Sequence, residues 1–230
     1  MSAINQEWTV AIPPLVDGDR LDRSTFHERY AAMPPETRAE LIGGVVHMSS
    51  PVRTDHGDYV GLLTAWAAGY ARGIDGLRVG CDSTLVLDER SEPQPDVHLR
   101  ILPDHGGQTG IESGYIAGSP ELVIEVAHSS RKIDLGPKFE DYRRTGVLEY
   151  VVVTSDPNEV YWFVRRDEAL ERMTPGTDGI YRSRQFPGLW LEPDALFDGD
   201  LERLFNTVER GRATPEFVEF AASMAARKRS

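Results

Sequence analysis

The chain has 230 residues, and its 40% hydrophobic and 27% charged residues are typical of a globular protein large enough for a sizeable core. Its formal net charge of −12 argues against a general affinity for nucleic acid, although it does not exclude a nuclease with clustered carboxylates. The single cysteine, Cys81, excludes an internal disulfide and a cysteine-based zinc cluster, and its neighbours predict a buried strand thiol. With no apolar run near the roughly 18 residues of a membrane helix and no signal peptide, we expect a cytoplasmic protein without a membrane partner.

The N-terminal part is expected to be irregular apart from one short helix. Ser24 or Thr25 can cap that helix, which runs to about Met33. Two short apolar runs then flank Gly43-Gly44. Strand-like runs around a pair of glycines predict a tight β-hairpin.

A long helix and two strands are predicted next. Residues 55–72 carry apolar side chains at helical spacing on one face. Residues 77–87 predict a strand with a bulge at Ser83, and residues 95–102 predict another. Residues 103–119 are rich in glycine and polar residues, so we expect a loop or an insertion.

The most apolar run, residues 122–127, predicts a central strand. A helix over residues 134–145 and a strand over residues 150–154 complete a β-α-β unit, whose two strands should be parallel. The remaining predictions are a strand at 160–164 that pairs back as a hairpin, short strands near 180–184 and 189–191 that finish the sheet, and helices at 193–205 and 215–226.

This order of elements predicts an α/β fold, with a mixed β-sheet flanked by helices, an N-terminal β-hairpin and C-terminal helices. We expect three parts: an irregular or short helical segment over residues 1–37, the main domain over residues 38–192, and a C-terminal helical extension over residues 193–230.

Two carboxylates, Asp96 and Glu125, interrupt short apolar runs that read as buried strands. A buried carboxylate is costly unless it is paired, protonated or bound to a metal. Either residue alone can pair with a nearby arginine or cap a turn. The two together, on neighbouring strands, can hold a divalent cation for metal-assisted phosphodiester hydrolysis.

Several short motifs, taken in order, resemble the Uma-two family of restriction endonucleases, a branch of the PD-(D/E)xK nuclease superfamily. The matching pieces are Glu40-Leu41-Ile42-Gly43-Gly44-Val45, His56 after Ser50-Pro51, Pro95-Asp96-Val97, residues 119–127, Ser129-Ser130, Asp134, Lys138, Tyr142, Gly146 and Glu149-Tyr150. The resemblance covers about residues 38–165. It implies a restriction-endonuclease-like core and a metal-dependent endonuclease that hydrolyses DNA.

The resemblance also implies roles for individual residues. Asp96 and Glu125 would bind Mg²⁺ or Mn²⁺, with the backbone carbonyl of Val126 as a further ligand. In the wider superfamily a lysine follows the second acid by two residues, but here that position is Ala127. Lys138 on the following helix matches the substitute lysine of the Uma-type pattern, and it would position the attacking water or offset charge on the phosphate.

Three accessory residues each have two interpretations. Glu40 either completes the metal shell or lies in solvent at the hairpin edge. His56 either contacts the phosphate or a metal-bound water, or it caps or packs the long helix. Tyr142, one helical turn beyond Lys138, either braces that lysine or packs in the core.

Two more polar residues lie close to the candidate site in the sequence. His98 would share a strand face with Asp96 if the strand is regular, although a lone histidine on a strand is usually structural. Asp134 is expected to cap the helix that carries Lys138.

Fold does not determine function, so other functions remain open. The chain could be a catalytically inactive nuclease-fold protein that binds or regulates, or an interaction protein that works through its terminal helices. A homodimer is plausible because cutting both DNA strands often needs two sites. Motifs of other hydrolase classes, such as a Gly-x-Ser-x-Gly elbow or an HExxH pair, are absent from the sequence.

Overall fold

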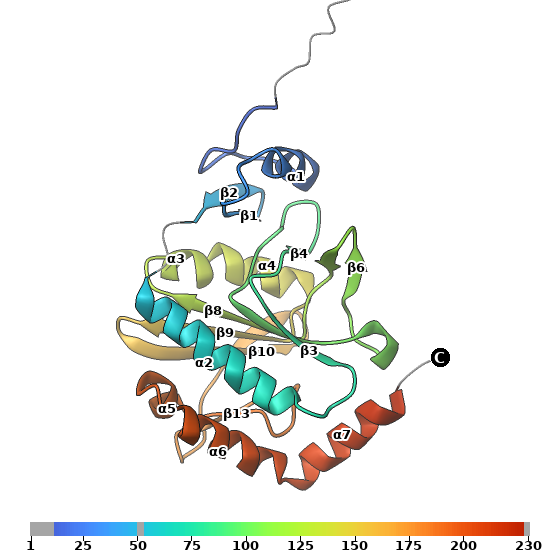
Figure 1. Ribbon diagram of the computed structural model, residues 1–230, viewed down its shortest axis with the longest axis vertical. Coiled ribbons are helices and arrows are strands. Elements are labelled where there is room, and N and C mark those ends of the chain that lie inside the picture. Colours follow the sequence, from blue (N-terminus) through green and yellow to red (C-terminus); the bar gives the residue numbers. More distant parts are fainter. Residues whose placement is uncertain (1–11, 50–52, 228–230) are drawn as a thin grey trace, which may run out of the picture.

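The computed structural model describes residues 12–49 and 53–227. At its centre is a six-stranded mixed sheet in the order β11-β10-β9-β8-β5-β3 (Figure 1). Its strands are β3 (Leu77–Cys81), β5 (Val97–Ile101), β8 (Leu122–Ala127), β9 (Glu149–Ser155), β10 (Asn158–Arg166) and β11 (Ala169–Met173). Strands β8 and β9 are parallel, and the other neighbours are antiparallel. The predicted mixed sheet, with residues 122–127 in its interior, is confirmed.

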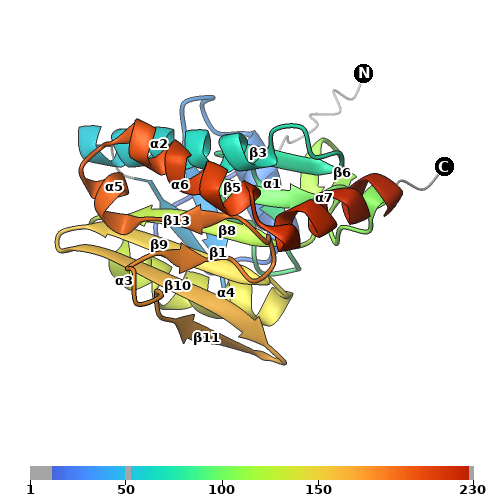
Figure 2. The same cartoon turned by 90° about the horizontal axis from the view of Figure 1, so that it is seen from below.

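Helices cover the two faces of this sheet (Figure 2). One face packs on α2 (Thr54–Ala71), α5 (Pro193–Phe197), α6 (Leu201–Arg212) and α7 (Pro215–Arg227), through a core that includes Trp66, Leu99 and Leu204. The other face packs on α3 (Arg131–Asp134) and α4 (Pro137–Thr145), through a smaller core around Tyr142 and Tyr150. All six residues of β8 are buried, because both faces of this strand are covered.

The N-terminal hairpin is confirmed as β1 (Ala39–Ile42) and β2 (Val45–Met48). Gly43 and Gly44 have φ angles of 59° and 84°, and positive φ at both central residues is what a type I′ turn requires. Helix α1 (Arg23–Ala31) precedes the hairpin, and its cap is Asp22 rather than Ser24 or Thr25. The Asp22 side chain accepts a 2.8 Å hydrogen bond from the Thr25 N–H, so it satisfies a free donor of the first turn.

The prediction of one bulged strand over residues 77–87 is wrong. Strand β3 ends at Cys81, and Asp82 has a φ of 49°, which turns the chain out of the main sheet. The next strand, β4 (Leu85–Val86), belongs to a separate sheet of order β4-β7-β6. Cys81 is exposed rather than buried, since it lies at the end of an edge strand.

Residues 103–119 also contain more structure than predicted. They form the short 3₁₀ helix η1 (Pro103–His105) and the antiparallel strands β6 (Gly110–Glu112) and β7 (Tyr115–Ala117). Strand β7 pairs with β4, and Leu85 and Ile116 of these strands join the smaller core around Tyr142. Strands of two or three residues are too short to show an alternating pattern.

The single helix predicted over residues 134–145 is two helices. Helix α3 ends at Asp134 and α4 begins at Pro137, with Gly136 between them as the N-terminal cap residue of α4. Proline restricts the preceding residue away from helical geometry, which explains the break. Asp134 therefore does not cap α4.

The C-terminal part differs in three details. Strand β11 was not predicted, and it lengthens the hairpin of β9 and β10 into a three-stranded meander at one edge of the sheet. The short strands β12 (Tyr181–Arg182) and β13 (Trp190–Leu191) pair with each other instead of joining the main sheet. The predicted helix over 193–205 is divided into α5 and α6 near Gly199, whose φ is 69°.

The predicted division into three parts stays a prediction. Leu204 and Val208 of α6 lie in the same core as Leu63 and Trp66 of α2, so the C-terminal helices pack on the sheet domain. Residues 1–11 and the Ser50-Pro51 motif lie outside the described residues. Among the described residues, no helix combines the length and apolar character needed to span a membrane.

Candidate active site

Carboxylates from three separate elements surround one buried lysine. The Lys138 Nζ of α4 lies 2.9 Å from Glu40 Oε1 of β1, 3.0 Å from Glu125 Oε1 of β8 and 3.8 Å from Asp134 Oδ1 of α3. Lys138, Glu125 and Asp134 are all buried. Glu40 also accepts a 2.6 Å hydrogen bond from the Gln94 N–H, two residues before Asp96. The structure thus brings Glu40, Glu125 and Lys138 together and adds Asp134.

Tyr142 contacts Glu125 rather than Lys138. Its hydroxyl donates a 2.9 Å hydrogen bond to Glu125 Oε1, the same oxygen that Lys138 contacts. The positions 138 and 142 are one helical turn apart, so both side chains project from α4 toward β8. Burial raises the pKa of Tyr142 well above its usual range, so the hydroxyl is a hydrogen-bond donor at neutral pH.

Asp96 lies just before β5 and is held from two sides. Its Oδ1 is 3.0 Å from His56 Nε2 of α2, and its Oδ2 accepts a 2.6 Å hydrogen bond from the Val126 N–H. The Asp96 hydrogen bond raises the pKa of His56 above its usual value. His56 and the Val126 N–H therefore position Asp96. The metal role predicted for the Val126 carbonyl stays a prediction.

The acidic cluster, defined as Glu40, Asp96, Glu125 and Asp134, contains carboxylates that repel one another, and burial makes their charged forms costly. Burial raises the pKa of Glu125 well above its usual range, the Lys138 ammonium opposes that shift, and the other three carboxylates add to it. Burial also raises the pKa of Asp134 to about 6. Burial alone would lower the pKa of Lys138, but the surrounding carboxylates raise it well above its usual range, so its ammonium persists. Perturbed titratable groups of this kind concentrate at functional sites.

The donor set of the acidic cluster fits Mg²⁺ or Mn²⁺. Both ions prefer carboxylate oxygen ligands, and the cluster holds more carboxylates than Lys138 and His56 can balance. The buried Asp134 Oδ2 has no hydrogen-bond partner among the described residues. Within residues 12–49 and 53–227, however, no three His, Cys, Asp or Glu side chains already form a metal-ligand cage. The Lys138 ammonium instead lies between carboxylates, so a metal would compete with it.

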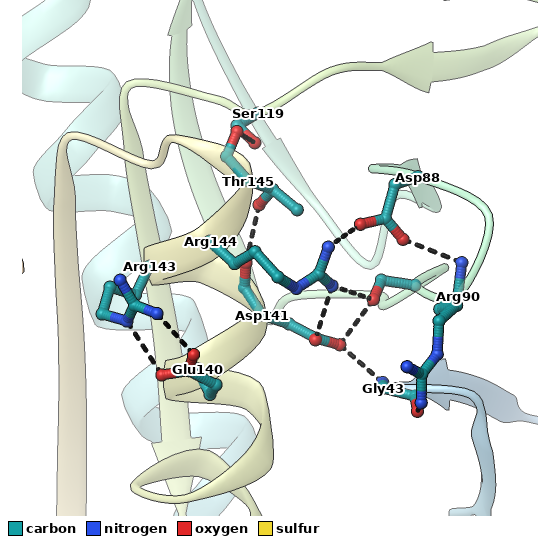
Figure 3. Close-up of polar contacts among 10 residues, drawn as sticks. Gly43, Asp88, Arg90, Ser119, Glu140, Asp141, Arg143, Arg144 and Thr145 are labelled. Atoms are coloured by element: carbon teal, nitrogen blue, oxygen red, sulfur yellow. Dashed lines mark hydrogen bonds and ion pairs between the residues drawn. The ribbon is translucent and has the colours of Figure 1, made fainter. Parts of the chain in front are cut away.

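A second polar network attaches the N-terminal hairpin to α4 (Figure 3). Asp141 Oδ2 accepts hydrogen bonds from the Gly43 N–H at 2.7 Å and from Ser91 Oγ at 2.6 Å. Arg144 donates to Asp141 Oδ1 at 2.8 Å and pairs with Asp88. Because Gly43 and Asp141 follow Glu40 and Lys138 by three residues each, this network sets the distance between those two site residues.

His98 does not join the candidate site. It is buried, and neither of its ring nitrogens has a hydrogen-bond partner among the described residues. It lies opposite Gly80 of β3 and Val123 of β8 in the strand register. A side chain added at Gly80 would meet the His98 ring at 2.4 Å, so Gly80 makes room for it.

The sequence interpretation did not include Asp141 and assigned Asp134 a different role. Asp141 acts on the backbone of a residue 98 positions away, a contact that no local pattern indicates. The signal for Asp134 was present, since an acid four residues before a lysine in one predicted helix favours an ion pair. The structure has this pair, at 3.8 Å, across the break between α3 and α4.

Comparisons with known proteins agree with this fold. A crystal structure described as a putative nuclease belonging to DUF820, from Anabaena variabilis ATCC 29413, is similar, with a TM-score of 0.59 and 15% sequence identity. The similarity covers 75% of this chain and 97% of that chain, and it supports the fold. No curated protein matches the chain. The model of the Uma2 family, described as "Putative restriction endonuclease", matches residues 24–194. The match spans well over half of the chain, which confirms the resemblance seen in the motifs: the protein belongs to the Uma2 family.

Proposed function

We propose that the protein is a metal-dependent endonuclease that hydrolyses phosphodiester bonds of DNA. The observation that carries the proposal is the buried acidic cluster around Lys138. Without a functional role, several carboxylates and one ammonium in a low-dielectric interior would cost more than an apolar core of the same size. Because the chain belongs to the Uma2 family, a nuclease site is the first explanation for these costly buried charges.

Asp96 and Glu125 are the residues proposed to hold Mg²⁺ or Mn²⁺, with Glu40 and the Val126 carbonyl as additional ligands. When bound, the ion supplies positive charge and an acidified water for phosphodiester hydrolysis. His56 and the Val126 N–H keep the Asp96 carboxylate in one orientation. Asp134 is a further candidate ligand, because one of its buried oxygens has no hydrogen-bond partner among the described residues.

Lys138 is proposed to act on the phosphate or on the attacking water. Its ammonium stays protonated because three carboxylates surround it. A preorganised cation in a buried site stabilises negative charge that develops in the transition state. Tyr142 donates to Glu125 Oε1 and so helps to fix the carboxylate beside Lys138.

One observation favours a second candidate, a catalytically inactive binding or regulatory protein. Lys138 already contacts both Glu40 and Glu125, so the acidic cluster has an internal cation. Such a cluster can persist as a structural ion-pair network without a metal. Metal affinity separates the two candidates, because a structural network would bind Mn²⁺ weakly or not at all.

The test is cleavage of supercoiled plasmid by the purified protein in Mn²⁺, in Mg²⁺ and in EDTA. The site variants are Asp96→Asn, Glu125→Gln and Lys138→Met. The matched control is Glu171→Gln, which removes an exposed carboxylate of β11 whose partner is Arg166. We expect metal-dependent nicking by the wild type and the control, and none by the three site variants.

Mn²⁺ calorimetry on the same proteins separates the roles of the residues. We expect Asp96→Asn and Glu125→Gln to lose Mn²⁺ affinity, because they remove ligands. Lys138→Met should keep or increase that affinity, since the competing ammonium is gone. Nicking that survives in Asp96→Asn and Glu125→Gln would place the activity elsewhere, and a wild type that neither cuts nor binds Mn²⁺ would favour the inactive protein.

A further inference from the structure

The face of the sheet that carries the acidic cluster also carries two arginines at its far end. Val97, Leu99 and Ile101 of β5 point into the core beneath α2, so the alternate positions, His98 and Arg100, point to the opposite face with Asp96. Arg100 is four residues beyond Asp96, which is about 13 Å along a strand. A ligand that reaches both ends must therefore be extended.

Arg78 and Arg100 are direct neighbours across two strands. They are partners in the antiparallel register of β3 and β5, and β3 is the edge strand of the main sheet (Figure 1). Arg78 is exposed and Arg100 is partly buried. Like charges placed opposite each other on a sheet destabilise it, so this pair has a cost in the free protein.

Neither guanidinium has the acidic partner that would offset this cost. Among the described residues, neither Arg78 nor Arg100 forms an ion pair with a carboxylate. Arg78 donates to the carbonyl of Leu77 at 2.8 Å, and the buried Nε of Arg100 has no hydrogen-bond partner among the same residues.

The acid that acts on Arg100, Glu121 of the segment leading into β8, does not provide that partner. Its two oxygens accept hydrogen bonds from the backbone N–H groups of Ile101 at 2.7 Å and Gln108 at 3.1 Å. It therefore offsets part of the Arg100 charge at a distance while its hydrogen bonds hold the insertion in place.

A second pair of arginines in the same molecule shows the contrast. Arg131 and Arg172 both lie over the ring of Tyr161, and both pair with Glu159. Their charges are already balanced by one shared carboxylate. Arg78 and Arg100 are also neighbours but share no acid, which leaves a position for an anion from outside.

We propose that Arg78 and Arg100 form a subsite for a backbone phosphate of duplex DNA, at a distance from the scissile bond on the same sheet face. The inference rests on the proposed function. It also explains how a chain with a net charge of −12 can bind DNA, because a local pair of unbalanced arginines attracts a phosphate that the chain as a whole repels. Since one duplex strand carries a phosphate per about 3.4 Å of axis, 13 Å corresponds to about four base pairs.

The test combines direct binding and cleavage. Fluorescence anisotropy with a fluorescein-labelled DNA duplex in EDTA, at several sodium chloride concentrations, measures affinity without cleavage. Nicking kinetics in Mn²⁺ measure kcat and KM. The variants are Arg78→Gln and Arg100→Gln. The control, Arg166→Gln, removes the same charge from β10, which lies four strand positions or about 19 Å from β3.

We expect each subsite variant to weaken duplex binding and raise KM about tenfold, the loss of one charge-assisted hydrogen bond, with kcat within about twofold. The logarithm of the association constant decreases linearly with the logarithm of the salt concentration. The magnitude of this negative slope should decrease by about 0.9 for each phosphate that the variant no longer neutralises. Arg166→Gln should change neither the duplex affinity nor the salt dependence. Equal affinity and equal slope in Arg78→Gln, Arg100→Gln and the wild type would overturn the subsite, as would a wild type that does not bind duplex.

The Arg78→Glu variant distinguishes a loss of phosphate binding from a purely structural effect. It places an acid opposite Arg100, so thermal stability should rise while duplex affinity falls further than in Arg78→Gln. A variant that loses both stability and affinity would contradict the proposal. If the wild type binds duplex but never cuts it, the proposed function fails, and anisotropy still decides the subsite.

Discussion

Two glutamates on neighbouring central strands are equally buried and have opposite surroundings. Glu149 of β9 accepts hydrogen bonds from the backbone N–H groups of Arg184 and Gln185, from Ser183 Oγ and from Trp162 Nε1, at 2.6 to 3.2 Å. All four donors are neutral, and three belong to one short loop. Glu125 of β8 faces Lys138 and Tyr142 on the other side of the sheet, with three further carboxylates around it.

The comparison shows that burial of a strand carboxylate does not by itself indicate a functional site. Burial raises the pKa of both glutamates. Glu149 is saturated with donors that hold the loop after β12, so its role is explained by structure alone. Glu125 shares one ammonium with competing acids, and that arrangement gains most from an added cation.

The largest expected effect is the loss of activity in Glu125→Gln. We expect plasmid nicking in Mn²⁺ to fall at least about 10³-fold, or about 4 kcal/mol of transition-state stabilisation. The urea midpoint should stay the same or rise, because removing one charge relieves repulsion within the acidic cluster. A variant that unfolds at room temperature, or one that cuts at the wild-type rate, would make Glu125 a structural residue like Glu149.

Glu149→Gln should produce the reverse pattern. We expect the free energy of unfolding to fall by about 3 kcal/mol. Arg184 and Gln185 both donate to Oε1, and Trp162 donates to Oε2, so the new amide NH₂ faces an N–H donor in either orientation. The nicking rate per folded molecule should stay within about twofold. Urea titration and nicking on the same preparation check both. Loss of cleavage with unchanged stability would show that the comparison is wrong.

Much of the fold could be predicted because long elements repeat their pattern. The apolar stripe of α2, the continuous apolar run of β8 and the Gly43-Gly44 turn all match local rules. Strands β4, β6 and β7 were missed because each has only two or three residues, and the partner of β4, strand β7, lies elsewhere in the chain. Cys81 was misjudged for a related reason: whether a strand is at the edge depends on its neighbours.

The candidate site was predicted from motif order, and geometry added what motifs do not contain. The interpretation named Asp96, Glu125, Lys138 and Glu40, and the structure brings Lys138 within reach of the two glutamates. The interpretation did not show that His56 would hold Asp96, since that contact joins α2 to the residue before β5. The metal roles themselves remain predictions.

His98 extends the comparison to a buried group with no partner among the described residues. Burial lowers its pKa to about 4, below the value near 6.5 of an unfolded histidine. The unfolded chain therefore binds more protons between these values, so His98 makes stability fall as the pH drops from 6.5 to 4. Between pH 7 and pH 5 in EDTA, we expect this loss to be about 2 kcal/mol.

Urea titrations of the wild type and His98→Gln at the two pH values check this expectation. The variant should lose less stability on acidification, even if it is less stable at pH 7. An identical loss in the two proteins would mean that His98 keeps an ordinary pKa, and so has a partner or access to water.

The smallest expected effect is that of Tyr142→Phe, which removes only the hydroxyl that donates to Glu125. Lys138 still contacts the same oxygen, so we expect the nicking rate to fall by less than about tenfold and stability to fall by about 1 kcal/mol. Nicking rates and urea midpoints beside Glu125→Gln provide the scale. A loss as large as that of Glu125→Gln would show that the phenol, and not the ammonium, controls the orientation of Glu125. The functional glutamate would then be held by a neutral donor, as Glu149 is.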